Sequence, residues 1–289
     1  MSRLLLVAVC CFGALFPISG FSENPETSLK EVRFQAAPIP PTPFQIRRAK
    51  AKGLVAKPKE GLTLTGFLGK PDDPDNRKRP AIIIMPSGDG VQNNHRQWAL
   101  KLVSQGYVTL LVDPFGSRGL KGFKDGHIEI LGDAVTAFDY MVTRPDVDQD
   151  RIGILGFSVG GSSVFRALAR NAESRPDNVH FRAGVSVYPQ CEPYEEFLAP
   201  LLVLAGDGDK LINVPACEKM LKAGKENVSV VMYPGITHFF DNVAYAKDAA
   251  LRPDNWVKPD WFEGNEYNQA AYIDAEKRVL GFFNSHLQQ

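Results

Sequence analysis

The chain has 289 residues, which is enough for one large α/β domain or for two smaller domains. Its 33 lysine and arginine residues balance 33 aspartate and glutamate residues, and no block of like charges indicates nucleic acid or an anionic membrane as a partner. A hydrophobic fraction of 44% suits a globular protein with a sizeable core. These properties favour a small-molecule substrate and no nucleic acid.

The chain begins with a segment typical of an export signal. Arg3 precedes the apolar run LLLVAVCCFGALFPISG, and the small residues near Gly20 and Ser22 suit cleavage. An uncleaved membrane anchor is the alternative, but Pro17 and Gly20 interrupt the run before it reaches the ~20 apolar residues of a spanning helix. We predict a signal peptide over residues 1–22, a secreted or periplasmic location, and no stable membrane association after cleavage.

The cysteines follow from this prediction. Cleavage would remove Cys10 and Cys11 and leave Cys191 and Cys217. In an oxidising compartment these two either form a disulfide or stay as buried thiols, and both alternatives are open because spacing along the chain gives no Cα distance. The cysteines are too few and too far apart for a Cys-rich zinc site, and no phosphate-binding loop or dinucleotide fingerprint is present. We therefore expect no metal and no cofactor.

Residues 23–43 are rich in proline and show little apolar periodicity, which predicts a linker or an extended arm. The next segment, residues 44–71, predicts two strands joined by a turn around residues 59–61. A polar loop over residues 71–80, PDDPDNRKRP, closes it.

From residue 81 onward, short apolar runs alternate with amphipathic segments. The runs suit strands of a parallel sheet that is covered on both faces, and segments such as 131–142 and 273–287 carry helical spacing. This alternation predicts one α/β domain over residues 44–289, with a mostly parallel, doubly wound sheet and helices on both faces. The six predicted strands are AIIIM (81–85), YVTLLV (107–112), RIGIL (151–155), FRAGVSVY (181–188), LLVLAG (201–206) and VSVVMY (228–233).

One G-x-S-x-G pattern stands between a predicted strand and a predicted helix, in RIGILGFSVGGSSV (151–164). The pattern alone is weak, and a Gly-rich turn with Ser158 as a helix N-cap is the alternative. A nucleophile elbow needs this strand-to-helix setting and small residues two positions to either side, where Gly156 and Gly160 stand. The helix N-terminus would aim the Val159 amide at a developing oxyanion. Ser158 is therefore the predicted nucleophile.

A serine hydroxyl needs a base, and the base needs an acid to orient it. Only His238 lies in the loop after the last predicted strand, where the base of this architecture belongs. Asp207 and Asp209 both follow LLVLAG, at a strand end where open α/β sheets bind ligands. We favour Asp209 as the acid, with Asp207 turning the chain. The histidines set aside by their position in the chain are His95, His127, His180 and His286.

The loop after the first of these strands, MPSGDGV (85–91), has small residues and backbone amides that suit an oxyanion hole. We predict the second oxyanion donor at the Asp89 amide and a substrate contact at Gly88. A plain turn is the alternative.

With these residues the sequence resembles the α/β-hydrolases, and within them the dienelactone hydrolase-like branch. The resemblance runs from about Phe44 to Leu287 and supports Asp209, because the family's acid ends a G-x-x-D pattern. Dienelactone hydrolases proper carry cysteine at the elbow, where Ser158 stands here, and many relatives have His-Gly in the oxyanion loop, where this chain has Ser87-Gly88. The motifs that carry the resemblance are PSGDG, WALKLVSQGYVTLLVDPFGSRG (98–119), RPDVDQDRIGILGFSVGG (144–161), AGDGD (205–209) and THFFDN (237–242).

The resemblance implies a serine hydrolase that cleaves small carboxylic esters or lactones through an acyl-serine intermediate, and the N-terminal segment predicts that it is exported. A serine peptidase of the same fold, or a catalytically silent binding protein, is the alternative. Arg118 matches a recurrent family arginine that could bind a substrate carboxylate, or could pair with Asp113 and hold its loop, the role we favour.

The surroundings of the site can also be predicted. Roughly ten residues separate the fourth and fifth predicted strands, too few for a cap, so we expect an open site. The aromatic residues after His238 either form one wall of it or pack the long loop; they are Phe239, Phe240, Tyr245, Trp256 and Trp261.

Overall fold

Eight strands form one sheet in the order β1-β2-β4-β3-β5-β6-β7-β8. β2 runs antiparallel to both β1 and β4, and all other neighbouring pairs are parallel. The six strands predicted from the apolar runs are β3 to β8, so the predicted mostly parallel sheet is confirmed. The strands are β1 (Lys30–Gln35), β2 (Thr63–Gly69), β3 (Arg79–Met85), β4 (Val108–Asp113), β5 (Val147–Phe157), β6 (Ala183–Val187), β7 (Leu201–Gly206) and β8 (Val228–Tyr233).

This computed structural model describes residues 28–38, 41–72, 77–126, 128, 130–170, 179–192, 194, 196–223 and 226–288. The predicted signal peptide, residues 1–22, lies outside these ranges. Within them, no helix combines the length and the apolar character needed to cross a membrane.

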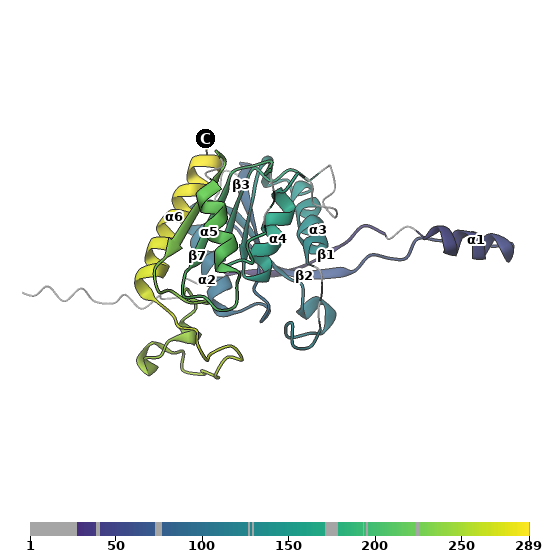
Figure 1. Cartoon of the computed structure of the whole chain (residues 1–289). Helices are drawn as coiled ribbons and strands as arrows, with labels where there is room; N and C mark the ends of the chain where they lie inside the picture. The colour runs from purple at the N-terminus through teal and green to yellow at the C-terminus, as the bar shows by residue number, and fades with distance from the viewer. Residues whose placement is uncertain are drawn as a thin grey trace, which may run out of the picture.

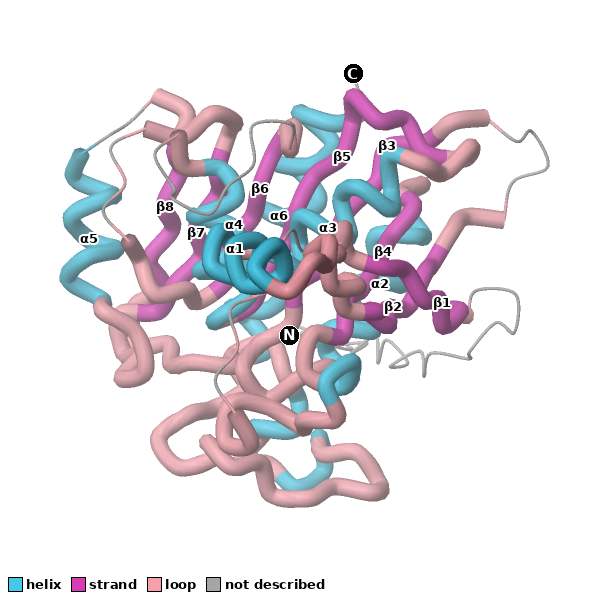
Figure 2. The backbone as a smooth tube through the Cα atoms, turned by 90° about the vertical axis from the view of Figure 1, so that its right-hand side faces the viewer, coloured by secondary structure: helices cyan, strands magenta, loops and turns pink. Residues whose placement is uncertain are grey.

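Helices cover both faces of the sheet (Figure 1 and Figure 2). Successive residues of a strand point to opposite faces: Ile83 and Met85 pack with α3, α4 and α5, whereas Ile82 and Ile84 pack with α2 and α6. Because both faces are buried, the strands are apolar without alternation, which is why they could be predicted. The helices are α1 (Pro43–Ala51), α2 (Asn93–Ser104), α3 (Leu131–Val142), α4 (Val159–Leu168), α5 (Val214–Ala223) and α6 (Gln269–Leu287).

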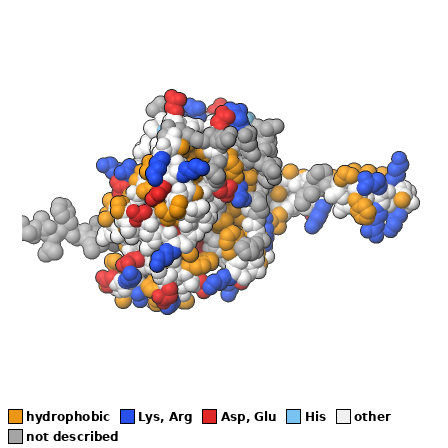
Figure 3. Space-filling model, viewed as in Figure 1, with side chains coloured by type: hydrophobic (Ala, Val, Ile, Leu, Met, Phe, Trp, Pro, Cys, Tyr) orange, Lys and Arg blue, Asp and Glu red, His pale blue; other side chains and the backbone are white. Residues whose placement is uncertain are grey.

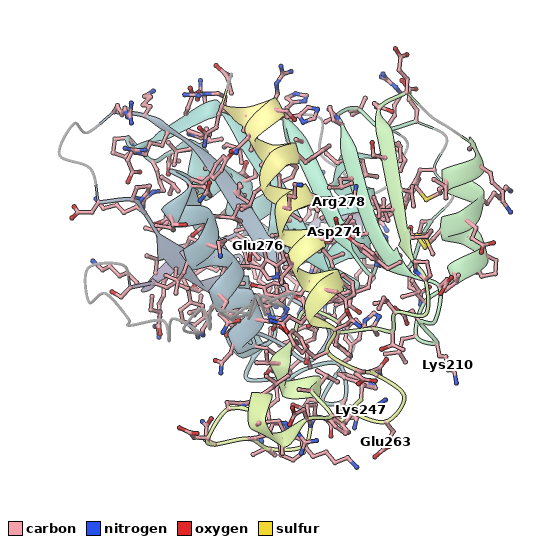
Figure 4. All side chains as sticks on the ribbon, turned by 90° about the vertical axis from the view of Figure 1, so that its left-hand side faces the viewer. Lys210, Lys247, Glu263, Asp274, Glu276 and Arg278 are labelled. Atoms are coloured by element: carbon pink, nitrogen blue, oxygen red, sulfur yellow. A yellow bond between two sulfur atoms is a disulfide. The ribbon has the colours of Figure 1, made fainter. Side chains whose placement is uncertain are left out.

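The last helix, α6, has an apolar face that packs on the sheet and a charged face that is exposed to solvent. α6 buries Val279 and Phe283 against the sheet. Figure 4 shows Asp274, Glu276 and Arg278 on α6, and Asp274 and Arg278 form an exposed ion pair one helical turn apart, at 2.5 Å. Such exposed pairs contribute little to stability, so apolar burial is what fixes α6 in place.

The structure corrects the prediction that residues 23–43 form a linker or an arm. This segment contains β1, which pairs with β2 along its whole length. Only Phe34 of KEVRFQ is buried, because an edge strand has a single neighbour, and the apolar signal was therefore too weak to detect. The sheet begins at Lys30 and not after residue 43.

The first of the two strands predicted over residues 44–71 is also wrong, because α1 lies there. A capping box starts this helix: the Thr42 hydroxyl accepts the Gln45 amide, and the Gln45 side chain accepts the Thr42 amide. Pro43 occupies the first turn, where its missing N–H costs nothing. These start signals outweigh the weak strand pattern.

We name the segment between β1 and β2, residues 36–62, the β1–β2 arm. Its base is closed by hydrogen bonds from the Ala36 amide to the Leu62 carbonyl (2.9 Å) and from the Gln35 side chain to the Gly61 carbonyl (3.2 Å). No residue of α1 is buried, and Figure 1 shows the helix standing away from the body. Figure 3 shows apolar and basic side chains on it. Since β1 is parallel to β4, the arm leaves from the carboxyl edge of the parallel strands.

Cys191 and Cys217 form a disulfide, with a Cα–Cα distance of 5.2 Å. The bond joins the segment after β6 to α5 (Figure 4) and settles the question that the sequence left open. In the described part of the connection between β6 and β7 there is no cap domain, as predicted.

Removing this disulfide should destabilise the protein. The cross-link closes a loop of 26 residues, and its loss should lower the free energy of unfolding by about 3 kcal/mol, since the unfolded chain regains freedom. Denaturant unfolding of the wild type with and without reductant, and of the Cys191→Ser/Cys217→Ser variant, measures this. Reductant should shift the midpoint of the wild type and not that of the variant. An equal shift in both proteins would contradict the prediction.

Candidate active site

Ser158 occupies a sharp turn between β5 and α4, with a φ of 52°, a value unusual for a residue with a side chain. The Ser158 amide donates to the Val187 carbonyl (2.9 Å) and holds the turn. A Cβ atom at Gly156 would lie 2.1 Å from the Gly160 oxygen, and one at Gly160 would lie 2.3 Å from the Met85 oxygen. Both glycines are therefore required for strand and helix to approach, as predicted.

Three predicted side chains meet at this turn. His238 Nε2 lies 2.9 Å from Ser158 Oγ, and His238 Nδ1 lies 2.6 Å from Asp209 Oδ2. The second Asp209 oxygen accepts the Leu211 amide at 2.8 Å, which fixes the carboxylate. With Nδ1–H donating to Asp209, Nε2 is free to accept the serine proton. Ser158 occupies the N-cap position of α4, but its side chain makes no capping hydrogen bond and instead lies 2.9 Å from His238 Nε2.

The two aspartates after β7 have different roles. Asp207 accepts the Gly235 amide at 2.5 Å and so joins two loops of the chain, whereas Asp209 reaches His238. Both His238 and Asp209 are buried, with exposed fractions of 1% and 5%. Of the remaining histidines, His95 contacts the loop after β3, His180 and His286 do not line the cleft at Ser158, and His127 is outside the described residues.

A buried carboxylate behind His238 was missed from the sequence. Asp241 accepts hydrogen bonds from the Tyr188 hydroxyl (2.7 Å), the Trp98 indole (2.9 Å) and the Asn94 amide (3.0 Å). The Tyr188 ring lies 4.4 Å from the His238 ring, centroid to centroid. Burial raises the pKa of Asp241, and the three donors oppose that rise. Its position three residues after His238 was the available signal, and the network holds the histidine loop against α2.

The loop after β3 contains a second hydrogen-bonded chain. The Ser87 hydroxyl donates to the Asp89 carboxylate and lies 3.2 Å from His95 Nε2, while His95 Nδ1 accepts the Gln92 amide at 3.0 Å. Burial lowers the pKa of His95 to about 3, so this imidazole is neutral and holds the loop without a charge. Gly88 lines the cleft at Ser158, so its contact with a substrate stays a prediction, while the Asp89 carboxylate turns to Ser87.

Asp89 should make stability depend on pH. Burial raises its pKa from 3.8 to about 6, although the Ser87 hydrogen bond and nearby His238 lower it. A raised folded-state pKa contributes stability below the unfolded pKa, and this contribution is lost as pH rises through about 6. Relative to Asp89→Asn, the wild type should therefore lose about 2 kcal/mol of unfolding free energy between about pH 4.5 and 7.5. Denaturant titrations of both proteins measure the difference, and a constant difference would contradict it.

Arg118 has a structural partner, but the predicted one is wrong. Its guanidinium donates to both carboxylate oxygens of Asp133 (2.8 and 2.9 Å) and to the Pro114 carbonyl (2.7 Å). Asp113 instead accepts the Gly116 amide at 2.8 Å, because the chain turns back on itself directly after β4. Arg118 thereby ties this turn to the start of α3.

An open cleft of about 560 Å³ lies over Ser158 and His238. Of the predicted aromatic residues, Phe239 and Trp261 line the cleft; Phe240 and Tyr245 are core residues, and Trp256 donates to the Ala244 carbonyl. The apolar lining residues are Phe123, Ile128, Ile130, Val159, Leu211, Phe239 and Trp261. Besides Ser158 and His238, the polar lining residues are Ser162, Ser163, Arg166, Gln190 and Glu192.

Comparison with known proteins agrees with this architecture. The model of the dienelactone hydrolase family matches residues 64–287. Among solved structures, a thermostable esterase from Pseudomonas putida is similar at a TM-score of 0.60 and 16% identity, over 91% of this chain and 84% of the esterase. Two independent comparisons thus point to the same fold.

Two curated relatives differ in how much they share with the chain. The bis(hydroxyethyl) terephthalate hydrolase of Streptomyces coelicolor is 24% identical over 281 residues, 92% of this chain and 86% of that enzyme. The human dipeptidyl peptidase 8 is 33% identical over 181 residues, which are 55% of this chain but only 19% of the peptidase. The chain thus spans about a fifth of the length of that relative. It belongs to the dienelactone hydrolase family of α/β-hydrolases.

Proposed function

We propose that the chain is an exported serine hydrolase that cleaves small carboxylic esters or lactones through an acyl-serine intermediate. The observation that carries the proposal is the arrangement of Ser158 Oγ, His238 Nε2 and Asp209 in one hydrogen-bonded line, at 2.9 and 2.6 Å. The line opens into a cleft, so a substrate carbonyl can reach the hydroxyl.

In the first half of the proposed reaction, Ser158 Oγ attacks the carbonyl carbon while His238 Nε2 takes the hydroxyl proton. The negative oxygen of the tetrahedral intermediate accepts hydrogen bonds from the amides of Val159 and Asp89. Val159 suits this role because it begins α4, and the first amides of a helix have no acceptor within the helix. Asp209 holds His238 in place and stabilises its charged form.

The intermediate collapses when the carbonyl re-forms and the bond to the alcohol oxygen breaks. His238 gives the proton to that oxygen, and the alcohol leaves. A water molecule then attacks the carbonyl carbon of the acyl group on Ser158, and His238 takes a proton from that water. When the bond between this carbon and Ser158 Oγ breaks, His238 gives the proton to Oγ, and the carboxylic acid is released. No cofactor takes part in these steps.

Two observations support export. The N-terminal sequence has the basic, apolar and small-residue regions of a signal peptide. The Cys191–Cys217 disulfide is a bond that persists in oxidising compartments such as the periplasm or the extracellular space.

A peptidase of the same fold is the second candidate, and the similarity to dipeptidyl peptidase 8 favours it. Rates on matched ester and amide substrates of one amino acid separate the two. Esters also hydrolyse faster than amides without an enzyme. If the ratio of kcat/KM for the ester to kcat/KM for the amide is no larger than this ratio of uncatalysed rates, the result favours the peptidase.

Labelling with a fluorophosphonate tests the proposed nucleophile. The mature wild type should react covalently at Ser158, and Ser158→Ala and His238→Ala should not, because one lacks the hydroxyl and the other its base. Peptide mapping by mass spectrometry locates the label. A folded wild type that does not react would favour a catalytically silent binding protein.

A further inference from the structure

Part of the polar lining of the cleft follows one face of α4. Ser158, Ser162 and Arg166 are spaced by four residues, so they lie along one side of the helix, and all three line the cleft. At a rise of 1.5 Å per residue, Arg166 begins roughly 12 Å along the helix from the nucleophile. This spacing could have been found in the sequence, and it places a guanidinium at the far end of the cleft.

Arg166 is held there by a carboxylate that also lines the cleft. Its Nη2 and Nε atoms donate to the two oxygens of Glu192, at 3.0 and 3.4 Å. The Tyr194 hydroxyl donates to Glu192 at 2.7 Å, and the disulfide at Cys191 fixes the neighbouring residue. We name Arg166 and Glu192 the distal subsite. Their side chains are 41% and 26% exposed, so a substrate can reach both.

The charges of the distal subsite decide what it can bind. A substrate carboxylate would be attracted by Arg166 and repelled by Glu192. A substrate ammonium group would be attracted by Glu192 and repelled by Arg166, so the subsite favours neither an anionic nor a cationic group. A hydroxyl group can accept from the guanidinium and donate to the carboxylate at once. The pair therefore suits a neutral hydroxyl.

The cleft that contains Ser158 and the distal subsite is also lined by apolar side chains. Phe123 and Trp261 are among them, and aromatic side chains pack favourably on flat rings. The acyl group stays bonded to Ser158 through both halves of the proposed reaction, and α4 carries both the serine and Arg166. The leaving alcohol departs on the side of His238. The acyl part is thus the part that lies along α4.

Resting on the proposed function, we infer that the preferred substrates are esters of aromatic carboxylic acids with a hydroxyl at the far end of the acyl group, bound by Arg166 and Glu192. The wild type should hydrolyse methyl 4-hydroxycinnamate with a kcat/KM about tenfold above that for methyl cinnamate. The factor is only about tenfold because the distal subsite is partly exposed, and a hydrogen bond to a partly exposed site discriminates less than one to a buried site. The assay is run near pH 7, where the phenol is neutral.

Two variants test the residues of the distal subsite. Arg166→Met should reduce the ratio of the two kcat/KM values to within about twofold. Glu192→Leu should move the preference from the hydroxyl to methyl 4-carboxycinnamate, because Arg166 then meets no opposing charge from residue 192. The matched controls are Arg170→Met and Glu196→Leu, an ion pair at 2.6 Å that does not line the cleft, and both should keep the wild-type ratio.

The outcomes separate this inference from the proposed function. A wild type that cleaves both cinnamates equally, or that reacts with fluorophosphonate but cleaves neither, overturns the distal subsite and leaves the serine hydrolase standing. A preference seen only between 4-hydroxybenzyl acetate and benzyl acetate overturns the assignment to the acyl side. A folded wild type that neither reacts with fluorophosphonate nor hydrolyses any ester overturns the proposed function itself.

Discussion

Asp209→Asn is expected to lower kcat for ester hydrolysis by roughly 10⁴-fold with little change in KM, which is the cost of losing the acid in a serine triad. The carboxylate accepts His238 Nδ1–H at 2.6 Å and so leaves Nε2 facing Ser158 Oγ. An amide at this position cannot stabilise the charged imidazole that forms as the serine attacks. Steady-state rates on a 4-nitrophenyl ester measure the loss.

Asp207→Asn is the matched control, because the same substitution is made two residues away. Asp207 accepts only a backbone amide, that of Gly235, in the described structure, and an asparagine oxygen can accept it as well. Its kcat should stay within about threefold of the wild type, as expected for a residue outside the proton path. Equal losses in the two variants would show that the effect comes from the loop and not from the acid.

Gly160→Ala should severely destabilise the fold at the nucleophile turn. Its Cβ would lie 2.3 Å from the Met85 oxygen and 2.5 Å from the Pro86 oxygen, both backbone atoms that cannot move without displacing β3. The expected loss is more than about 3 kcal/mol of unfolding free energy, enough to prevent recovery of soluble protein. Thermal and denaturant unfolding measure it.

Gly132→Ala provides the control on another helix. A Cβ at Gly132 meets no atom within 4 Å, and the residue lies in the first turn of α3. Alanine should stabilise the protein by about 0.5–1 kcal/mol, because it reduces the freedom of the unfolded chain. If Gly160→Ala were as well tolerated as Gly132→Ala, the close packing of the elbow against β3 would be disproved.

The sequence predicted strands β3 to β8 and the order of the three site residues, but it did not predict the edge strand β1. Strands β3 to β8 could be predicted because burial on both faces makes them continuously apolar, and the order Ser158, Asp209, His238 follows from the ends of those strands. The edge strand β1 was missed because a single buried side chain, Phe34, leaves almost no pattern. Sequence spacing predicts local structure well where burial repeats regularly.

Contacts between distant segments could not be predicted in the same way. The disulfide stayed open, and Arg118 was assigned to Asp113 although Asp133 is its partner. Both pairings depend on distances between elements, which only the assembled sheet sets. Asp241 was overlooked for the same reason, since its three donors come from α2 and from the end of β6.

The β1–β2 arm has a practical consequence for anyone who handles this protein. Because hydrogen bonds at Ala36 and Gly61 close its base, the sheet does not depend on what lies at the tip. Gly53, just after α1, has open space around it and a φ of 68°. A peptide tag inserted there would be presented to solvent away from the core, so the arm is a suitable point for tethering the protein to a solid support.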